Sequence, residues 1–247
     1  MDFQAIAVIW YRDVLRFLRD KPQILGSLAR PILWLLFVGF GLGAAFHEVQ
    51  GISYIQFIFP GVIALNLLFA SFLSAISIIW DREFGFLREI LVAPIPRTSI
   101  ALGKAASGAT TAVLQGLIVL AFAPVVHVSV SLPQLAALLM LMFALAFACT
   151  SIGILIASHL TSFEGFGVIS NFIIMPMFVL SGAIFPVEGL PRWLAFFLHL
   201  NPMTYGVDGL RFILLGRHSF PLATDLAFVV AFAALMLIGA VARFERG

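Results

Sequence analysis

Residues 81–98 read Asp-Arg-Glu-Phe-Gly-Phe-Leu-Arg-Glu-Ile-Leu-Val-Ala-Pro-Ile-Pro-Arg-Thr, and this charged segment separates two long apolar stretches. Charge is scarce elsewhere, because the 247 residues contain only 14 Lys or Arg and 12 Asp or Glu. The segment, called the charged island below, also carries apolar side chains that a plain connecting loop would not expose to water. It therefore predicts a docking site for a partner outside the membrane.

The rest of the chain has the composition of a membrane protein. Hydrophobic residues make up 62% of it and the mean hydropathy is +1.11, well above the values of a soluble domain. A membrane-spanning helix needs roughly 20 apolar residues. The uncharged runs thus predict one all-α transmembrane domain over 1–247, with six spans at 25–46, 57–79, 103–125, 133–158, 165–185 and 222–242.

The distribution of Lys and Arg predicts the orientation of these spans. Three of the 14, Arg192, Arg211 and Arg217, fall on one side, and the other eleven fall on the opposite side. Cytosolic segments carry the excess of positive charge, so both termini and the charged island are expected in the cytosol. No cluster of basic residues is dense enough for a phosphate backbone, so nucleic acid is not expected as a partner.

The first 22 residues predict an amphipathic helix that ends near Pro22. Apolar side chains such as Trp10 share one face at helical spacing, and Arg12, Asp13 and Arg16 lie on the opposite face. Such a helix lies on the membrane surface, with Trp10 at the depth of the headgroups. It serves either as a surface anchor or as one wall of a partner's docking site, and the sequence favours neither.

Two short apolar helices are expected in the outer segment 186–216. Prolines divide it into one helix at about 191–199 and another at about 202–215, both too short to span, so a re-entrant pair before the last span fits best. Asp208 and Arg211 are three residues apart and are expected to pair.

Polar residues inside the second and fifth spans mark a candidate path for a transported molecule. A buried amide in lipid is costly without a partner, so Asn66 and Asn171 should face protein or a cavity. These two side chains either form hydrogen bonds between helices or line the path. The residues considered for the path are Asn66, Phe69, Ser74, Asn171, Phe172, Met175 and Phe178.

The sequence lacks the patterns of the common catalytic and metal sites. Gly103-Lys104 is followed by Ala105, so the phosphate-binding Gly-Lys-Ser/Thr pattern is missing. Cys149 is alone and the histidines are scattered, which favours no metal site. An intramembrane enzyme is the competing interpretation from another class, but no zinc-protease, serine-elbow or paired-carboxylate pattern supports it. An ion-coupled carrier would require ionisable groups in mid-span.

Two motifs resemble the membrane subunit of type-2 ABC exporters, with bacterial daunorubicin-resistance permeases closest in appearance. The first is Arg82-Glu83-Phe84-Gly85 with Leu87-Arg88-Glu89 and the later Pro94-Ile95-Pro96-Arg97. The second runs from Leu180-Ser181-Gly182 through Phe185-Pro186 and Asn201-Pro202-Met203-Thr204-Tyr205 to Asp208-Gly209-Leu210-Arg211.

The resemblance implies a division of labour between subunits. Two permease chains would pair as a homodimer in a bacterial plasma (inner) membrane, and two copies of a separate ABC ATPase would carry ATP and magnesium, with no cofactor bound by this chain. The residues implied in contact with the ATPase are Trp10, Arg16, Arg82, Glu83, Phe84, Gly85, Arg88 and Glu89. Those implied in an outer cap are Pro186, Asn201, Pro202, Tyr205, Asp208 and Arg211.

The function that this resemblance implies is ATP-driven export of an amphipathic small molecule, such as a drug, an antibiotic or a lipid-like compound. Export of a lipid-linked polysaccharide or glycolipid is the alternative, because both kinds of exporter use the same scaffold.

Overall fold

A computed structural model describes residues 1–45, 48–49, 51–83, 95–160, 162–187 and 190–246. Nearly all of this part of the chain is helical, as the all-α prediction requires. The elements are α1 (Phe3–Arg19), α2 (Lys21–Leu33), η1 (Trp34–Phe40), α3 (Gly41–Ala45), β1 (Glu48–Val49), β2 (Ile52–Ser53), α4 (Tyr54–Glu83), α6 (Arg97–Leu120), η2 (Ala123–Val126), α7 (Leu132–His159), α8 (Phe163–Val179), α9 (Arg192–Leu200), α10 (Pro202–Leu215) and α11 (Leu222–Arg246).

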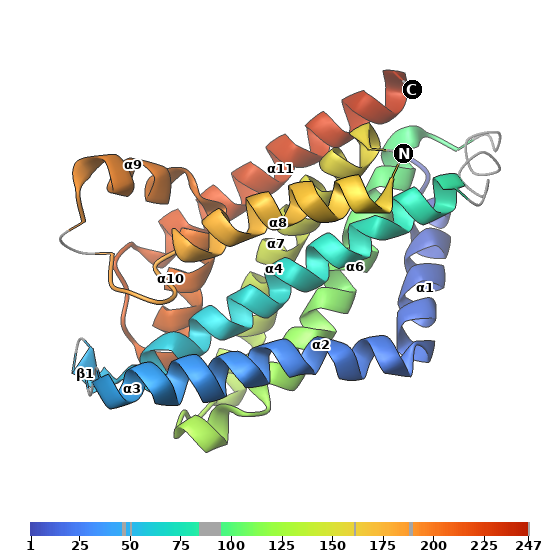
Figure 1. The fold of residues 1–247 in the computed structure, drawn as a ribbon. Coiled ribbons are helices and arrows are strands. Elements are labelled where there is room, and N and C mark those ends of the chain that lie inside the picture. The colour runs from blue at the N-terminus through green and yellow to red at the C-terminus, as the bar shows by residue number, and fades with distance from the viewer. Residues whose placement is uncertain (46–47, 50, 84–94, 161, 188–189, 247) are drawn as a thin grey trace.

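The long helices form a bundle with two distinct ends (Figure 1). Both chain termini lie at one end, together with the ends of α4 and α6 that flank residues 84–94. The short strands and the α9–α10 pair lie at the opposite end. These are called the terminal end and the hairpin end below.

Four helical segments are long and apolar enough to cross a membrane, namely Lys21–Gly43, Tyr54–Asp81, Leu132–His159 and Leu222–Ala242. They match the predicted first, second, fourth and sixth spans. The predicted third span corresponds to α6, which is rich in Ser, Thr and Gly and carries Lys104. The predicted fifth span corresponds to α8, an apolar helix of 17 residues. The six-span arrangement therefore stays a prediction.

Helix ends follow from capping side chains. The Asp2 carboxylate accepts hydrogen bonds from the backbone amides of Gln4 and Ala5, at 3.0 and 3.2 Å, and starts α1. Ser162 caps α8 in the same way, and Asn201 caps α10 by accepting from the Met203 amide at 3.0 Å. Helices α8 and α10 thus begin at a polar capping residue, whereas α9 begins after Pro191 without a side-chain cap.

Small residues allow the helices of the bundle to approach closely. A Cβ atom added to Gly61 in α4 would lie 2.7 Å from Ala183 Cβ and 3.0 Å from its backbone oxygen. At Gly153 in α7 it would lie 2.8 Å from Ala75 Cβ. Close backbone packing of this kind replaces the hydrophobic effect as a source of helix association within lipid.

The first span departs from a regular α-helix. Its central part, η1, is π-helical, which means that each amide bonds five residues back rather than four. The irregularity follows Pro31, which lies inside α2 and lacks the backbone donor of an ordinary helix residue. The span ends at a two-strand hairpin in which Glu48 pairs with Ser53. Neither feature is predicted from composition.

The N-terminal helix forms as predicted over Phe3–Arg19 and packs against α6. Its buried residues are Ala5, Ile9 and Phe17, whereas Phe3 is 78% exposed. The Cβ atom of Ile9 would lie 3.0 Å from a Cβ added to Gly103 in α6. Two residues of the predicted charged face, Arg12 and Asp13, form ion pairs with other helices, and the placement of the apolar face on the membrane surface stays a prediction.

Candidate functional site

Four charged side chains from three helices meet at the terminal end of the bundle. Lys104 Nζ in α6 lies 2.6 Å from Asp81 Oδ2 in α4 and 3.0 Å from Asp13 Oδ2 in α1. Arg12 Nη2 lies 2.7 Å from Asp13 Oδ1 and 3.1 Å from Asp81 Oδ2. This cluster of two cations and two anions, called the ionic junction below, has no net charge.

The contacts of the ionic junction matter for stability because two of its charged residues are buried. Lys104 is 4% exposed and Asp81 is 6% exposed, and a buried charge is tolerated only when it is paired and hydrogen-bonded. Lys104 also donates to the Ser77 hydroxyl at 3.1 Å. Burial acts to lower the pKa of Arg12, but the adjacent carboxylates of Asp13 and Asp81 outweigh it, so the pKa is raised above the ordinary arginine value.

Further contacts place α1 beside both ends of the charged island. The Asp2 amide donates to Ser99 Oγ at 2.9 Å, near the point where α6 begins, and Arg12 reaches Asp81, near the point where α4 ends. Exposed apolar side chains continue along the outer side of α1 at Phe3, Val8 and Tyr11. The N-terminal helix and the two ends of the island thus form one continuous surface.

The residues expected to contact an ATPase are only partly described by the structure. Trp10 Nε1 donates to Thr110 Oγ1 at 2.9 Å, which fixes α1 to α6. The Arg16 guanidinium lies 5.5 Å from the ring centroid of Trp80 near the end of α4. Glu83 is exposed in the last turn of α4. Arg82 also belongs to α4, while Phe84, Gly85, Arg88 and Glu89 lie outside the described residues.

Sequence reasoning missed the ionic junction because Arg12 and Lys104 were counted only as cytosolic charges that set the topology. The available signal was the placement of Lys104 within an otherwise uncharged run. A cation there needs a carboxylate at similar depth, and the end of α4 offers one in Asp81.

Two adjoining cavities run from the ionic junction into the bundle. The first, of about 350 Å³, lies between α1, α4 and α6 and is lined in part by Asp13, Ser74 and Gln115. The second, of about 180 Å³ and called the inner cavity below, lies between α2, α4 and α6. Both are lined by Gln23, Ala70, Leu73 and Gln115, so they are neighbours.

The predicted path residues divide between two places. Asn66 and Phe69 line the inner cavity and Ser74 lines its neighbour. On α8, Phe172 is 79% exposed and Met175 is 51% exposed. The remaining two also differ, since Asn171 is exposed while Phe178 is buried with its ring 5.0 Å from that of Trp34. The structure therefore brings together the α4 members but not the α4 and α8 sets.

The outer pair α9–α10 forms as predicted, with different internal contacts. The Asp208 carboxylate accepts hydrogen bonds from the backbone amides of Ser219 and Phe220, each at 2.9 Å. Arg211 Nη2 donates to the Gly182 carbonyl at 2.9 Å. The predicted Asp208–Arg211 ion pair is not among the ion pairs of the described residues, because each group has a backbone partner instead.

The other cap residues pack this pair onto the bundle. Asn201 Nδ2 donates to the Met177 carbonyl at 2.6 Å, and the Tyr205 hydroxyl donates to the His199 carbonyl at 3.0 Å. Tyr205 is only 6% exposed, because α10 packs it into the bundle. Pro202 is buried in the first turn of α10, and Pro186 is half-buried before α9.

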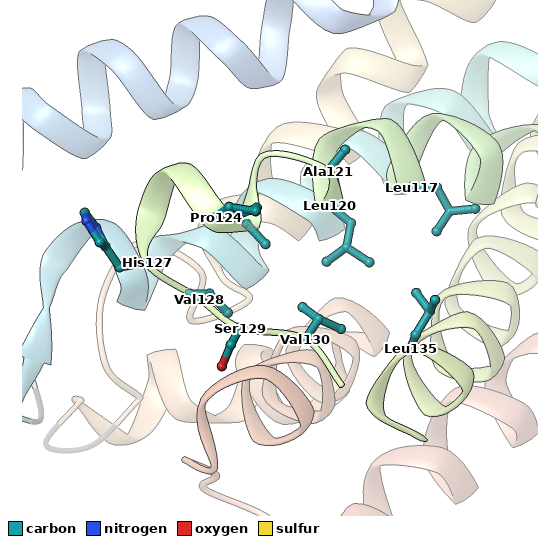
Figure 2. A pocket seen from close by; sticks show the side chains of 10 residues that line it. Leu117, Leu120, Ala121, Pro124, His127, Val128, Ser129, Val130 and Leu135 are labelled. Atoms are coloured by element: carbon teal, nitrogen blue, oxygen red, sulfur yellow. The ribbon is translucent and has the colours of Figure 1, made fainter. Parts of the chain in front are cut away.

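A larger apolar hollow of about 710 Å³ opens at the junction of α6, η2 and α7. Leu117, Leu120, Val130 and Leu135 point toward its centre, whereas His127 points away (Figure 2). Within the described part of the chain, no group of three or more His, Cys, Asp or Glu residues is arranged to hold a metal ion.

Comparison with known proteins gives a consistent family. Residues 4–215 of this chain match the protein family described as "ABC-2 type transporter". The chain is 28% identical over 253 residues to "Inner membrane transport permease YadH" of Escherichia coli (strain K12), covering 98% of this chain and 95% of that protein. It is 30% identical to "Putative transport permease ycf38" of Cyanophora paradoxa, covering 93% and 80%. It is 31% identical to "Nodulation protein J" of Rhizobium meliloti (strain 1021), covering 84% and 80%.

Proposed function

Since this chain belongs to the ABC-2 type transporter family, we propose that it is the permease subunit of an ATP-driven exporter in a bacterial inner membrane. In this proposal α2, α4, α6, α7, α8 and α11 cross the membrane. The terminal end then faces the cytosol and the hairpin end faces outward. The excess of Lys and Arg at the terminal end supports this orientation.

The single observation that carries the proposal is the surface formed by α1 and both ends of the charged island. The Arg12–Asp81 and Asp2–Ser99 contacts hold α1 beside the ends of α4 and α6. A separate ABC ATPase, present in two copies with its own ATP and magnesium, would dock here. Movement of that subunit would then reach α4 and α6 directly, because the ionic junction links both helices to α1.

Homodimerisation is part of the proposal and is supported by the exposed side of α8. Val168, Phe172 and Met175 are 72%, 79% and 51% exposed on a helix of 17 residues. A second copy of the chain would cover this face. The transport path would then run between the two copies, so Asn171 from each permease would contribute to it.

The proposed cargo is an amphipathic molecule, such as a drug, an antibiotic or a lipid-like compound. The apolar lining of the bundle beside a few amides and charges supports this class. A lipid-linked polysaccharide or glycolipid is the second candidate, because such a molecule is also amphipathic.

Co-purification with an ABC ATPase tests the proposal. The tagged permease is co-expressed with each candidate ATPase of its organism, and ATP hydrolysis is measured for the permease alone and for the complex. We expect turnover only in the complex. Loss of the ATPase is expected for Glu83→Ala, Phe84→Ala and Arg88→Ala, because truncating a central interface residue typically costs about 2 kcal/mol or more.

Matched controls are Glu48→Ala and Arg217→Ala, which remove the same charges at the hairpin end. ATP hydrolysis by the purified permease alone would favour an intramembrane enzyme instead. Wild-type ATPase recovery by all three island variants would remove the island from the docking surface.

A further inference from the structure

The inner cavity contains a cation without a counter-ion. Arg30 is the only charged residue among the described residues that line it. None of the ion pairs found among the described residues involves Arg30. The other lining residues are Gln23, Gly26, Ser27, Asn66, Phe69, Ala70, Leu73 and Gln115.

The position of Arg30 makes this unpaired charge significant. Arg30 is exposed on the surface of the single chain and lies within the candidate span Lys21–Gly43, roughly 14 Å beyond Lys21 along the helix axis at a rise of 1.5 Å per residue. Ionisable residues at such depths are rare and mark a pathway or a binding site, since they require a partner. A helix that retains an arginine there is therefore expected to place it against an anion.

The orientation of the guanidinium suits such a partner. Its central carbon lies 3.5 Å from the ring centroid of Phe69, so the planar group is stacked on the ring. Stacking occupies the flat face of a guanidinium and leaves its N–H edge free for a bidentate contact. Carboxylate and phosphate oxygens match this edge in geometry and charge.

A second residue that lines the same cavity, Asn66, carries a donor without a partner in the described structure. Asn66 is 4% exposed, and its Nδ2 donor has no hydrogen-bond partner within the described structure. Leaving a buried donor unpaired costs about 1–3 kcal/mol. Gln115 is 5% exposed and lines the same cavity from α6. A guanidinium edge and amide donors around one space of about 180 Å³ form a site that is rich in donors.

We propose that the inner cavity binds the anionic group of an amphipathic molecule, a phosphate or a carboxylate, through Arg30 and the Asn66 amide. The alkyl part of the molecule would extend along the apolar surface of α2 and α4. Two sources supply this chemistry, namely the exported cargo and the headgroup of an anionic membrane lipid. Only the first rests on the proposed function.

Binding is tested with the full-length permease in nanodiscs of phosphatidylcholine. The probe is radiolabelled dodecyl phosphate, and dodecanol of equal chain length is the neutral competitor. We expect saturable binding that unlabelled dodecyl phosphate displaces and dodecanol does not. Equal displacement by dodecanol would overturn the proposal, because the alkyl chain alone would then account for binding.

Four variants test separately how the charge of Arg30, the hydrogen bond of Asn66 and the free volume of the inner cavity contribute to binding. Arg30→Gln is expected to weaken binding about tenfold or more, since a hydrogen bond to a charged group is lost, while Arg30→Lys should weaken it less. Asn66→Leu keeps the side-chain size and should weaken binding about fivefold. Gly26→Leu should reduce binding by filling the cavity without loss of thermal stability, because a Cβ added there meets no atom within 4 Å.

Arg217→Gln is the matched control and should bind as the wild type does, because it removes an exposed arginine whose Nη2 atom lies 3.7 Å from a Cβ built on Gly51, between β1 and β2. If Arg30→Gln binds dodecyl phosphate as tightly as this control, the site is not where we place it. Folding is monitored by the thermal midpoint of each variant, so a general loss of structure is recognised.

Two further arms identify the source of the anion. If dodecyl phosphate raises ATP turnover by the permease–ATPase complex, the site serves the cargo. If phosphatidylglycerol in the nanodisc displaces the probe and turnover does not respond, the site serves a lipid. Either result supports the anion site. If the permease binds the probe but captures no ABC ATPase in the co-purification experiment, the proposed function fails and the anion site stands, so the two failures are distinguishable.

Discussion

The Lys104 ammonium lies 2.6 Å from the Asp81 carboxylate, and both side chains are more than nine-tenths buried. This contact joins α4 to α6 at the ends that flank the charged island. Asp13 contacts the same ammonium from α1 at 3.0 Å. Three helices are thus held at one point by charges that need one another to remain buried.

Replacing Lys104 by Met should destabilise the permease by about 3–5 kcal/mol, because it leaves two carboxylates at a buried site with Arg12 as the one cation that contacts them in the described structure. The free energy of unfolding in detergent micelles measures the effect. Arg192→Met, at an exposed position, is the control and should change it by less than about 0.5 kcal/mol. A loss as small as that of the control would mean that water or another cation already compensates Asp13 and Asp81.

Replacing Gly61 by Ala should lower stability by about 1–3 kcal/mol, since the new methyl group overlaps the backbone of Ala183, which cannot rotate away. Gly167→Ala is the matched control, because a Cβ there meets no atom within 4 Å. The control should be neutral or slightly stabilising in a helix. Thermal unfolding of both variants decides the matter, and equal midpoints would show that α4 does not approach Ala183 closely.

Replacing Asn201 by Ala should cost about 1–2 kcal/mol, because the side chain caps α10 and also donates to the Met177 carbonyl. The α9–α10 pair should become more accessible to protease added from the outer side. Asn171→Ala removes an exposed amide and serves as the control. Unchanged proteolysis would indicate that prolines and packing alone hold the pair in place.

A cysteine at Phe172 should form a disulfide between two permease copies under mild oxidation, if α8 lies at the dimer interface. Cys149 is first replaced by Ser, although it is buried. A cysteine at Phe178, which is 1% exposed, is the control and should not cross-link. Non-reducing electrophoresis measures the product. If neither cysteine cross-links efficiently although the molecular mass shows a dimer, the dimer interface lies on a helix other than α8.

Much of the fold can be predicted from the lengths of the uncharged apolar runs and from the prolines that interrupt the chain. The spans matching α4, α7 and α11 follow from uncharged runs, and α9 and α10 from prolines and short apolar segments. The limits of α6 differ from those of the predicted span 103–125, because the helix begins six residues earlier, at Arg97, and ends at Leu120. Lys104 lies buried within this helix because Asp13 and Asp81 neutralise its charge.

Local spacing failed where long-range partners compete. The Asp208–Arg211 spacing fits an ion pair on one helix face, yet the Asp208 carboxylate and the Arg211 Nη2 atom both bond to backbone groups outside α10. The charged face of α1 looked like a solvated surface because its counter-ions Asp81 and Lys104 lie far along the chain. The inner cavity combines Arg30 from α2 with Asn66 from α4, and no periodicity in either helix predicts that encounter.

The ionic junction also imposes an order on the making of the protein. Asp13 and Arg12 are synthesised first, but their partners Asp81 and Lys104 exist only after the ribosome has completed the segments that form α2, α4 and the start of α6. Until then α1 has no buried place to occupy. The N-terminal helix is therefore made early and docked late, after α4 and the start of α6 have been made.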